Sequence, residues 1–174
     1  FRETNGPELR GHRDAGLREA VFAAARGDHR GGDGRHVDDA AGEAYDKIAR
    51  YLGLGYPGGP VIDRIAKTGN PQFVNFTRPM TKSGDYNFSF SGIKTALIYL
   101  TKKNPDMLKK ENLENIAASF QAAAIDVLVM KTIKAAKEFK TDKILVSGGV
   151  AANSRLREEF KKAGLEYAVR QIAL

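Results

Sequence analysis

The stretch that most constrains the fold runs from Lys143 to Phe160 and reads KILVSGGVAANSRLREEF. The apolar run Ile144–Val146 predicts a short strand that is covered on both faces. Gly148 and Gly149 come next, and a backbone without Cβ atoms can turn sharply and let a ligand approach closely. A helix is then predicted from Val150 to Lys162. Together these elements indicate an α/β unit.

The start of that helix can attract an anion or a polar ligand, because its first N–H groups are free and the helix dipole is positive there. Asn153 is expected on the first turn, where its amide can both donate and accept hydrogen bonds. The segment can be interpreted as a nucleotide or phosphate site with Gly148 and Gly149 as its floor. It can equally be an ordinary strand-to-helix turn of an α/β domain.

Length and composition narrow the class of protein. A chain of 174 residues suits one domain, and 42% hydrophobic residues allow a sizeable core. The absence of cysteine excludes disulfides and thiolate metal sites. No apolar run approaches the roughly 20 residues of a membrane span and no leader pattern opens the chain, so a cytoplasmic protein without membrane contact is expected. The formal charge of +7 favours an anionic partner such as nucleic acid, or simply reflects a solvated surface.

Residues 1–37 differ in composition from the rest of the chain. They hold seven arginines and no lysine, whereas residues 38–174 hold six arginines and fifteen lysines. All three histidines also lie in this first part: His12, His29 and His36. The segment can be a basic arm for nucleic acid, a tail that does not fold, or a foreign piece from a frame shift or fusion. We therefore expect an atypical tail over 1–37, disordered or foreign to the rest of the chain, followed by a partial domain over 38–174.

Two short helices are predicted on either side of a glycine- and proline-rich loop. Asp38 or Asp39 can cap the first helix. Five residues at helical spacing give it a core face: Ala41, Tyr45, Ile48, Ala49 and Leu52. The loop Gly53–Pro60 contains four glycines and two prolines. Pro60 suits the first position of a second helix over Val61–Lys67.

Two carboxylates, Asp46 and Asp63, flank this loop. Ribose hydroxyls need acceptors of this kind beside a backbone that comes close, and Gly58 and Gly59 supply such a backbone. The alternative is a pair of surface carboxylates next to a helix–helix connection.

The middle of the chain is predicted to be mostly helical. The elements expected there are aromatic strands over Phe73–Phe76 and Tyr86–Phe90, helices over Gly92–Lys103 and Glu111–Phe139, and a strand over Leu165–Val169. Ser91 can cap the first of these helices, and the second is expected to be buried up to Met130. Four lysines follow at Lys131, Lys134, Lys137 and Lys140. They could contact nucleic-acid phosphates or form a plain solvated helix end.

Six segments, in order and with short gaps, resemble one family. They are DDAAGEAYDK at 38–47, GLGYPGGPVID at 53–63, RPM at 78–80, NFSFSGIKT at 87–95, ASFQ at 118–121 and GGVAANSRLR at 148–157. Together they resemble the universal tRNA threonylcarbamoyladenosine transferase family, known as TsaD in bacteria and formerly as O-sialoglycoprotein endopeptidase. The resemblance covers about Asp38 to Lys162, the second half of such a protein.

The resemblance implies an incomplete lobe of the actin, Hsp70 and hexokinase (ASKHA) fold, of α/β class with a mostly helical insert. It implies an acyltransferase that moves threonylcarbamoyl from threonylcarbamoyl-adenylate to N6 of adenosine 37 in tRNAs that read codons starting with A. By motif position, Asp46, Gly59, Asp63 and Asn153 match the residues that bind the adenylate. The partners implied are tRNA and, in bacteria, an inactive paralogue and an ATPase subunit.

The family also implies a divalent metal, iron or zinc, whose ligands are not recognisable in this sequence. The family's HxxxH pair and the aspartate of its cysteine-threonine-aspartate-asparagine motif are absent, and so is its serine-glycine-glycine-histidine-threonine motif. ATP or threonylcarbamoyl-adenylate is the expected nucleotide. We therefore expect a truncated transferase that is inactive alone. The alternatives are a non-catalytic ASKHA binding or scaffold paralogue and a small-molecule kinase of the same superfold.

Overall fold

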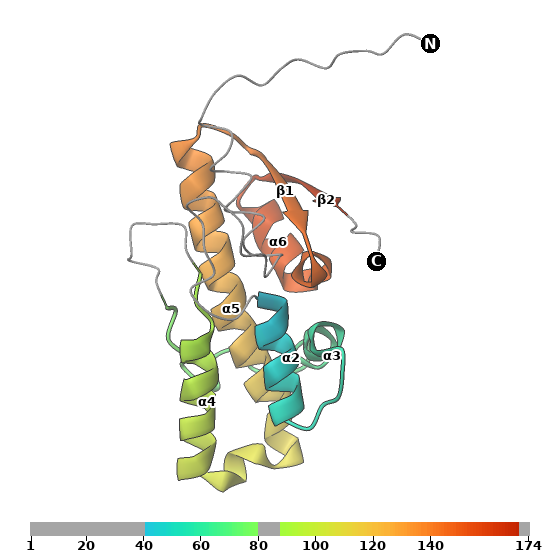
Figure 1. The fold of residues 1–174 in the computed structure, drawn as a ribbon, viewed down its shortest axis with the longest axis vertical. Coiled ribbons are helices and arrows are strands. Elements are labelled where there is room, and N and C mark those ends of the chain that lie inside the picture. The colour runs from blue at the N-terminus through green and yellow to red at the C-terminus, as the bar shows by residue number, and fades with distance from the viewer. Residues whose placement is uncertain (1–40, 80–87, 171–174) are drawn as a thin grey trace.

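The computed structural model describes residues 41–79 and 88–170, which form an α/β structure (Figure 1). Five α-helices, two short 3-10 helices and a two-stranded parallel sheet lie within these residues. The α/β class predicted from the sequence is therefore confirmed. In chain order the elements are α2 (Ala41–Tyr51), α3 (Gly58–Ile65), α4 (Ser91–Lys103), η1 (Pro105–Leu108), α5 (Lys110–Glu138), β1 (Lys143–Ser147), η2 (Gly149–Ala152), α6 (Ser154–Lys162) and β2 (Glu166–Arg170).

Helix α5 is the central element, and α3, α4 and α6 all pack against it. Its 29 residues agree with the predicted long helix, and every residue from Ile116 to Val129 except Asp126 is buried. By length and composition α5 could cross a membrane, but 83% of its most apolar window is buried inside the protein. An amphipathic surface helix would show one apolar stripe, whereas α5 is apolar nearly all round because neighbours surround it.

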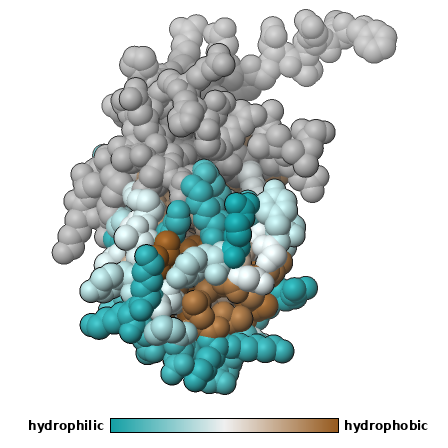
Figure 2. Space-filling view, turned by 60° about the horizontal axis from the view of Figure 1, so that its bottom comes forward, coloured by the Kyte–Doolittle hydropathy of each residue, from teal (hydrophilic) through white to brown (hydrophobic). Residues whose placement is uncertain are grey.

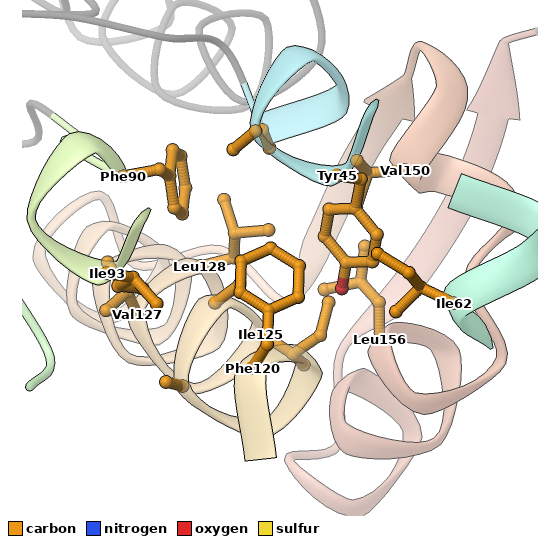
Figure 3. Packing of buried hydrophobic residues seen from close by; sticks show 14 of the residues in the cluster. Tyr45, Ile62, Phe90, Ile93, Phe120, Ile125, Val127, Leu128, Val150 and Leu156 are labelled. Carbon is orange, nitrogen blue, oxygen red and sulfur yellow. The ribbon is translucent and has the colours of Figure 1, made fainter. Parts of the chain in front are cut away.

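Aromatic and branched side chains from most helices meet in one core (Figure 3). Tyr45 of α2 and Phe120 of α5 pack edge to face, with ring centroids 4.9 Å apart. Ile62 of α3 and Leu156 of α6 lie beside this pair. The predicted core face of α2 is confirmed, because all five of its residues are buried.

Strands β1 and β2 pair in parallel, and the chain between them passes through η2 and α6. Ile144 and Val146 are buried, but the intervening Leu145 is 36% exposed. The prediction that this strand is covered on both faces is therefore wrong for the described residues. Successive side chains of a strand point to opposite faces, and only one face of this sheet packs on the core.

The second helix begins earlier than its sequence predicts. Helix α3 starts at Gly58 rather than Val61, so Pro60 is its third residue and not its first. The backbone N–H of Gly58 donates to Asp46 Oδ1 of α2 at 2.7 Å. This bond satisfies an N–H that would otherwise have no partner at the helix start, so α3 can begin there. The expected caps Asp38 and Asp39 lie outside the described residues.

The segment Phe73–Phe76 is irregular, and its prediction as a strand is wrong. The N–H of Val74 donates to the Ser119 hydroxyl of α5 at 3.0 Å, and that hydroxyl donates to Asn70 O at 3.1 Å. The polar groups that a β-ladder would need are thus used to hold this loop on α5. Of the other expected strand, Tyr86 and Asn87 lie outside the described residues, and of the described Phe88–Phe90 only Phe88 forms a bridge.

The start of α4 differs from its prediction by one residue. Ser91 is the first residue of α4 rather than its cap; the cap position is Phe90, which provides no side-chain hydrogen bond. Helix α4 ends before Asn104-Pro105, as expected. Apolar side chains gather between hydrophilic ones at one end of the molecule (Figure 2). This is the end at which α4 ends, η1 lies and α5 begins.

Two adjacent glycines of α3 allow a matched test of the α2–α3 contact. A Cβ on Gly58 would collide with the carbonyl oxygen of Tyr45 and lie 2.7 Å from Asp46 Cα, whereas a Cβ on Gly59 would meet nothing within 4 Å. We expect Gly58→Ala to lower the free energy of unfolding by about 1–3 kcal/mol. Gly59→Ala should leave it unchanged or raise it by about 0.5–1 kcal/mol, because alanine favours a helix. Urea denaturation of both variants provides the measurement, and equal losses would contradict the predicted collision.

Candidate functional site

Asn153 is the N-cap of α6 and does not lie on the first turn of that helix. Helix α6 starts at Ser154, and the preceding residues Gly149–Ala152 form the 3-10 turn η2, so the single helix predicted from Val150 is wrong. The side chain of Asn153 caps α6: its Oδ1 accepts the N–H of Leu156 at 3.0 Å. Asn153 is only 5% exposed. The sequence predicts that this amide faces a ligand, but its oxygen already accepts a hydrogen bond from the chain itself.

Asp63 of α3 lies against the same helix start. Its carboxylate accepts the Ser154 hydroxyl at 2.8 Å and the Ser154 N–H at 3.2 and 3.3 Å. A carboxylate at a helix N-terminus is favoured by the helix dipole and by the free N–H groups. The anion that the sequence predicts at this helix start is therefore supplied by the protein.

Gln121 of α5 connects the two predicted residues. Its Nε2 donates to Asp63 Oδ1 at 3.3 Å, and its Oε1 accepts from Asn153 Nδ2 at 2.9 Å. Gln121 is 4% exposed. We call Asp63, Gln121, Asn153 and Ser154 the Asp63 network; it ties α3, α5 and α6 together through side chains.

Asp46 stands on α2, which packs on α3 and η2. One oxygen of Asp46 accepts the N–H of Gly58. Among the described residues, no partner contacts its other oxygen, Oδ2. Asp46 and Asp63 thus lie on two helices that both contact the η2 turn, but only Asp63 hydrogen-bonds to that region directly.

The four glycines expected on the floor of a nucleotide site are placed in two ways. A Cβ added to Gly59 or Gly149 would meet nothing within 4 Å, so these backbones face open space. Gly148 has a φ of 91°, which requires the left-handed conformation that glycine adopts without strain. Gly58 is different, because it is buried against Tyr45 and its N–H is already bound. Gly58 therefore packs α3 on α2 rather than forming an open floor.

The hydroxyl of Tyr45 is buried next to the network. Burial raises the pKa of Tyr45 well above its usual range, the negative charge of Asp63 raises it further, and Arg155 lowers it. Within the described residues, neither Tyr45 Oη nor Arg155 Nε has a hydrogen-bond partner. The hydroxyl thus remains protonated at any physiological pH.

A second charged group lies at the start of α6. Arg78 donates from Nε and Nη2 to Asp126 Oδ2 at 3.2 and 2.8 Å, and Arg155 Nη2 lies 3.7 Å from Asp126 Oδ1. Asp126 therefore joins the 78–80 motif to α6 through α5. These side chains are about one-third exposed, so the pairs contribute little to stability and mainly orient the arginines.

Two other predictions concern metal and anion binding. Over residues 41–79 and 88–170, no group of three or more histidine, cysteine or carboxylate side chains could hold a metal ion. The three histidines lie outside these residues. Of the four lysines that could contact phosphates or form a solvated helix end, Lys134, Lys137 and Lys140 are exposed. Lys131 is 3% exposed and lies over the Phe88 ring, so it fits neither alternative, a phosphate contact or a solvated helix end.

A family model described as tRNA N6-adenosine threonylcarbamoyltransferase matches residues 4–173 of this chain. Relatives with that name include proteins of Thermotoga neapolitana, 56% identical over 126 residues, and Thermosipho africanus, 55% identical over 131 residues. A third, from Geobacter metallireducens, is 48% identical over 140 residues. The matches cover 72%, 74% and 78% of this chain but 37%, 38% and 41% of the relatives. The chain belongs to the tRNA N6-adenosine threonylcarbamoyltransferase family and spans well under half the length of these relatives.

Gln121 and Ser154 were not assigned to the site from the sequence. Gln121 closes the ASFQ motif, and Ser154 follows Asn153 directly, so both stood inside segments that carry the family resemblance. A glutamine in an apolar helix stretch is the available signal, because a buried amide requires hydrogen-bond partners.

We expect the raised pKa of Tyr45 to appear in the pH dependence of stability. Tyrosine in the unfolded chain loses its proton near pH 10, whereas folded Tyr45 retains it. This contribution to stability is complete below about pH 10 and is lost as the pH rises above it, by up to about 1.4 kcal/mol per pH unit.

Tyr45→Phe provides the measurement, because it keeps the ring and removes the ionisable hydroxyl. At pH 7 it should cost little, since no described residue bonds the hydroxyl. Urea denaturation between pH 7 and 11 should show that, above pH 10, the free energy of unfolding falls less in the variant than in the parent chain. A difference in free energy of unfolding between the two chains that does not change with pH would contradict the raised pKa of Tyr45.

Proposed function

We propose that this chain forms the nucleotide-holding part of a transferase that moves threonylcarbamoyl from threonylcarbamoyl-adenylate to N6 of adenosine 37 in tRNA. Family membership supports this proposal, and the names of the relatives give the reaction class. The observation that carries it for this chain is the Asp63 network. It fixes the glycine turn of 148–149 against α3, where the open backbones of Gly59 and Gly149 leave room for a ligand.

Each residue of the site has a distinct task in this proposal. Asp46 Oδ2 has no partner among the described residues, so it accepts a ribose hydroxyl of the adenylate. Asp63 is committed to Ser154 and Gln121, so it holds the turn in place. The free second hydrogen of Asn153 Nδ2 can donate to the nucleotide. The open glycines admit the adenylate close to the backbone.

In the proposed reaction, the amine of adenosine attacks the carbamoyl carbonyl and AMP leaves. The described residues contribute by holding the AMP part in one place, which lowers the entropy cost of bringing the reacting groups together. The metal that the family implies does not fit the described residues, since they contain no cluster of ligands for it. No step of the proposal therefore depends on a metal held by this segment.

The finer fold and the partners are also part of the proposal. A strand, a glycine turn and a helix packed on α3 and α5 are compatible with part of an ASKHA lobe. The tRNA would bind with its phosphates near exposed lysines such as Lys134 and Lys137. The protein would act in the cytoplasm with the partner proteins of the family.

Titration with AMP tests the role of Asp46. We expect Asp46→Asn to weaken AMP binding about tenfold, because one acceptor of a charged hydrogen bond is lost. Glu43→Gln is the matched control: Glu43 is an exposed carboxylate one turn earlier on α2, and its ion pair among the described residues is with Lys47. Isothermal titration calorimetry or NMR gives the affinities. Equal weakening by both substitutions, or none by Asp46→Asn, would refute the assignment.

A further inference from the structure

Gln121 contacts two residues of the proposed adenylate site and belongs to none of the groups discussed above as ligands. It comes from the ASFQ motif of α5, and the proposed function uses it only as a hydrogen-bond partner of Asp63 and Asn153. Its side chain is 4% exposed, and both ends of the amide are used: Nε2 by Asp63 at 3.3 Å and Oε1 by Asn153 at 2.9 Å. A buried amide with both ends engaged has one orientation, not two.

The order of donors and acceptors along the network is fixed from one end. The N–H of Leu156 can only donate, so Asn153 must turn Oδ1 toward it. Asn153 Nδ2 then points to Gln121, so Gln121 must turn its Oε1 toward it to accept the hydrogen bond. The Nε2 group of Gln121 is left facing the carboxylate of Asp63. Turning the Gln121 amide over would set two N–H₂ groups against each other and an oxygen against a carboxylate.

We propose that Gln121 is a positioning residue of the site. It fixes the amide of Asn153 and the carboxylate of Asp63 in one orientation, and it acts on the nucleotide only through them. This inference rests on the proposed function. Its physical basis is that α5 is the most completely buried helix of the described residues. Gln121 therefore gives a rigid reference position to two shorter helices, α3 through Asp63 and α6 through its cap Asn153.

Without Gln121, Asn153 loses the contact that fixes the direction of its amide. Asp63 would still be held by Ser154, but Asn153 Nδ2 would lose its one described acceptor. The side chain of Asn153 could then rotate about the bond that caps α6. The loss is one of orientation as well as of stability, and the two effects can be separated by experiment.

Three variants of the full chain test the inference. Gln121→Leu removes both hydrogen bonds while keeping the volume similar. Gln121→Glu keeps the acceptor for Asn153 but places a second carboxylate against Asp63. Thr132→Val is the matched control, because Thr132 is 5% exposed on the same helix and lies eleven residues away, about 16 Å along its axis.

We expect Gln121→Leu to speed hydrogen exchange of the Asn153 side-chain amide and to weaken AMP binding, each about tenfold, as the loss of one net hydrogen bond implies. NMR measures the exchange and calorimetry the affinity. Thr132→Val, an equally conservative change at a buried position of the same helix, should leave both values unchanged. For Gln121→Glu, AMP affinity should recover as the pH falls, because a protonated carboxyl group again offers one donor and one acceptor.

Unchanged exchange of the Asn153 amide in Gln121→Leu would overturn the inference. So would equal loss of affinity in Thr132→Val, since the effect would then be general destabilisation. If the parent chain does not bind AMP while Asn153 still exchanges faster in Gln121→Leu, the proposed function fails and the orienting role of Gln121 stands.

Discussion

The contact between the Asp63 carboxylate and the start of α6 is the interaction on which the rest of the site depends. It joins a residue of α3 to one that lies 91 positions later, through a backbone N–H and a hydroxyl at once. A helix start concentrates unpaired N–H groups and positive dipole charge, so a carboxylate placed there satisfies both. The glycine turn before α6 is thereby held at a fixed position relative to α3.

Helix α5 supports this contact and a second one on another side. Ser119 and Gln121 are two residues apart, so they project about 200° from each other around the helix. Ser119 holds the irregular 70–74 segment, while Gln121 reaches the Asp63 network. The apolar stretch of α5 from Ile116 to Val129 thus carries two buried polar side chains, each satisfied by a different part of the chain.

Two buried polar atoms near this network, Tyr45 Oη and Arg155 Nε, have no hydrogen-bond partner in the described part of the chain. Burial without a partner costs free energy, which well-packed apolar neighbours such as Phe120 offset. The charges of Asp63 and Arg155 act on Tyr45 with opposite sign. The candidate site therefore lies where the apolar core around Tyr45 meets the charged side chains of Asp63 and Arg155.

The sequence by itself determined the local elements and the site segments. Periodicity predicted α2, α4 and α5, and the resemblance pointed to Asp46, Asp63 and Asn153, because these patterns depend only on neighbours along the chain.

The tertiary structure decided where those segments meet. It moved the start of α3 to Gly58 through Asp46, used the Val74 N–H for Ser119 instead of a strand, and exposed Leu145 on the uncovered face of the sheet. It also placed Gln121 and Ser154 within hydrogen-bonding distance of Asp63. Each of these outcomes depends on which distant polar group reaches an unpaired backbone or side-chain atom, and that information is absent from local sequence.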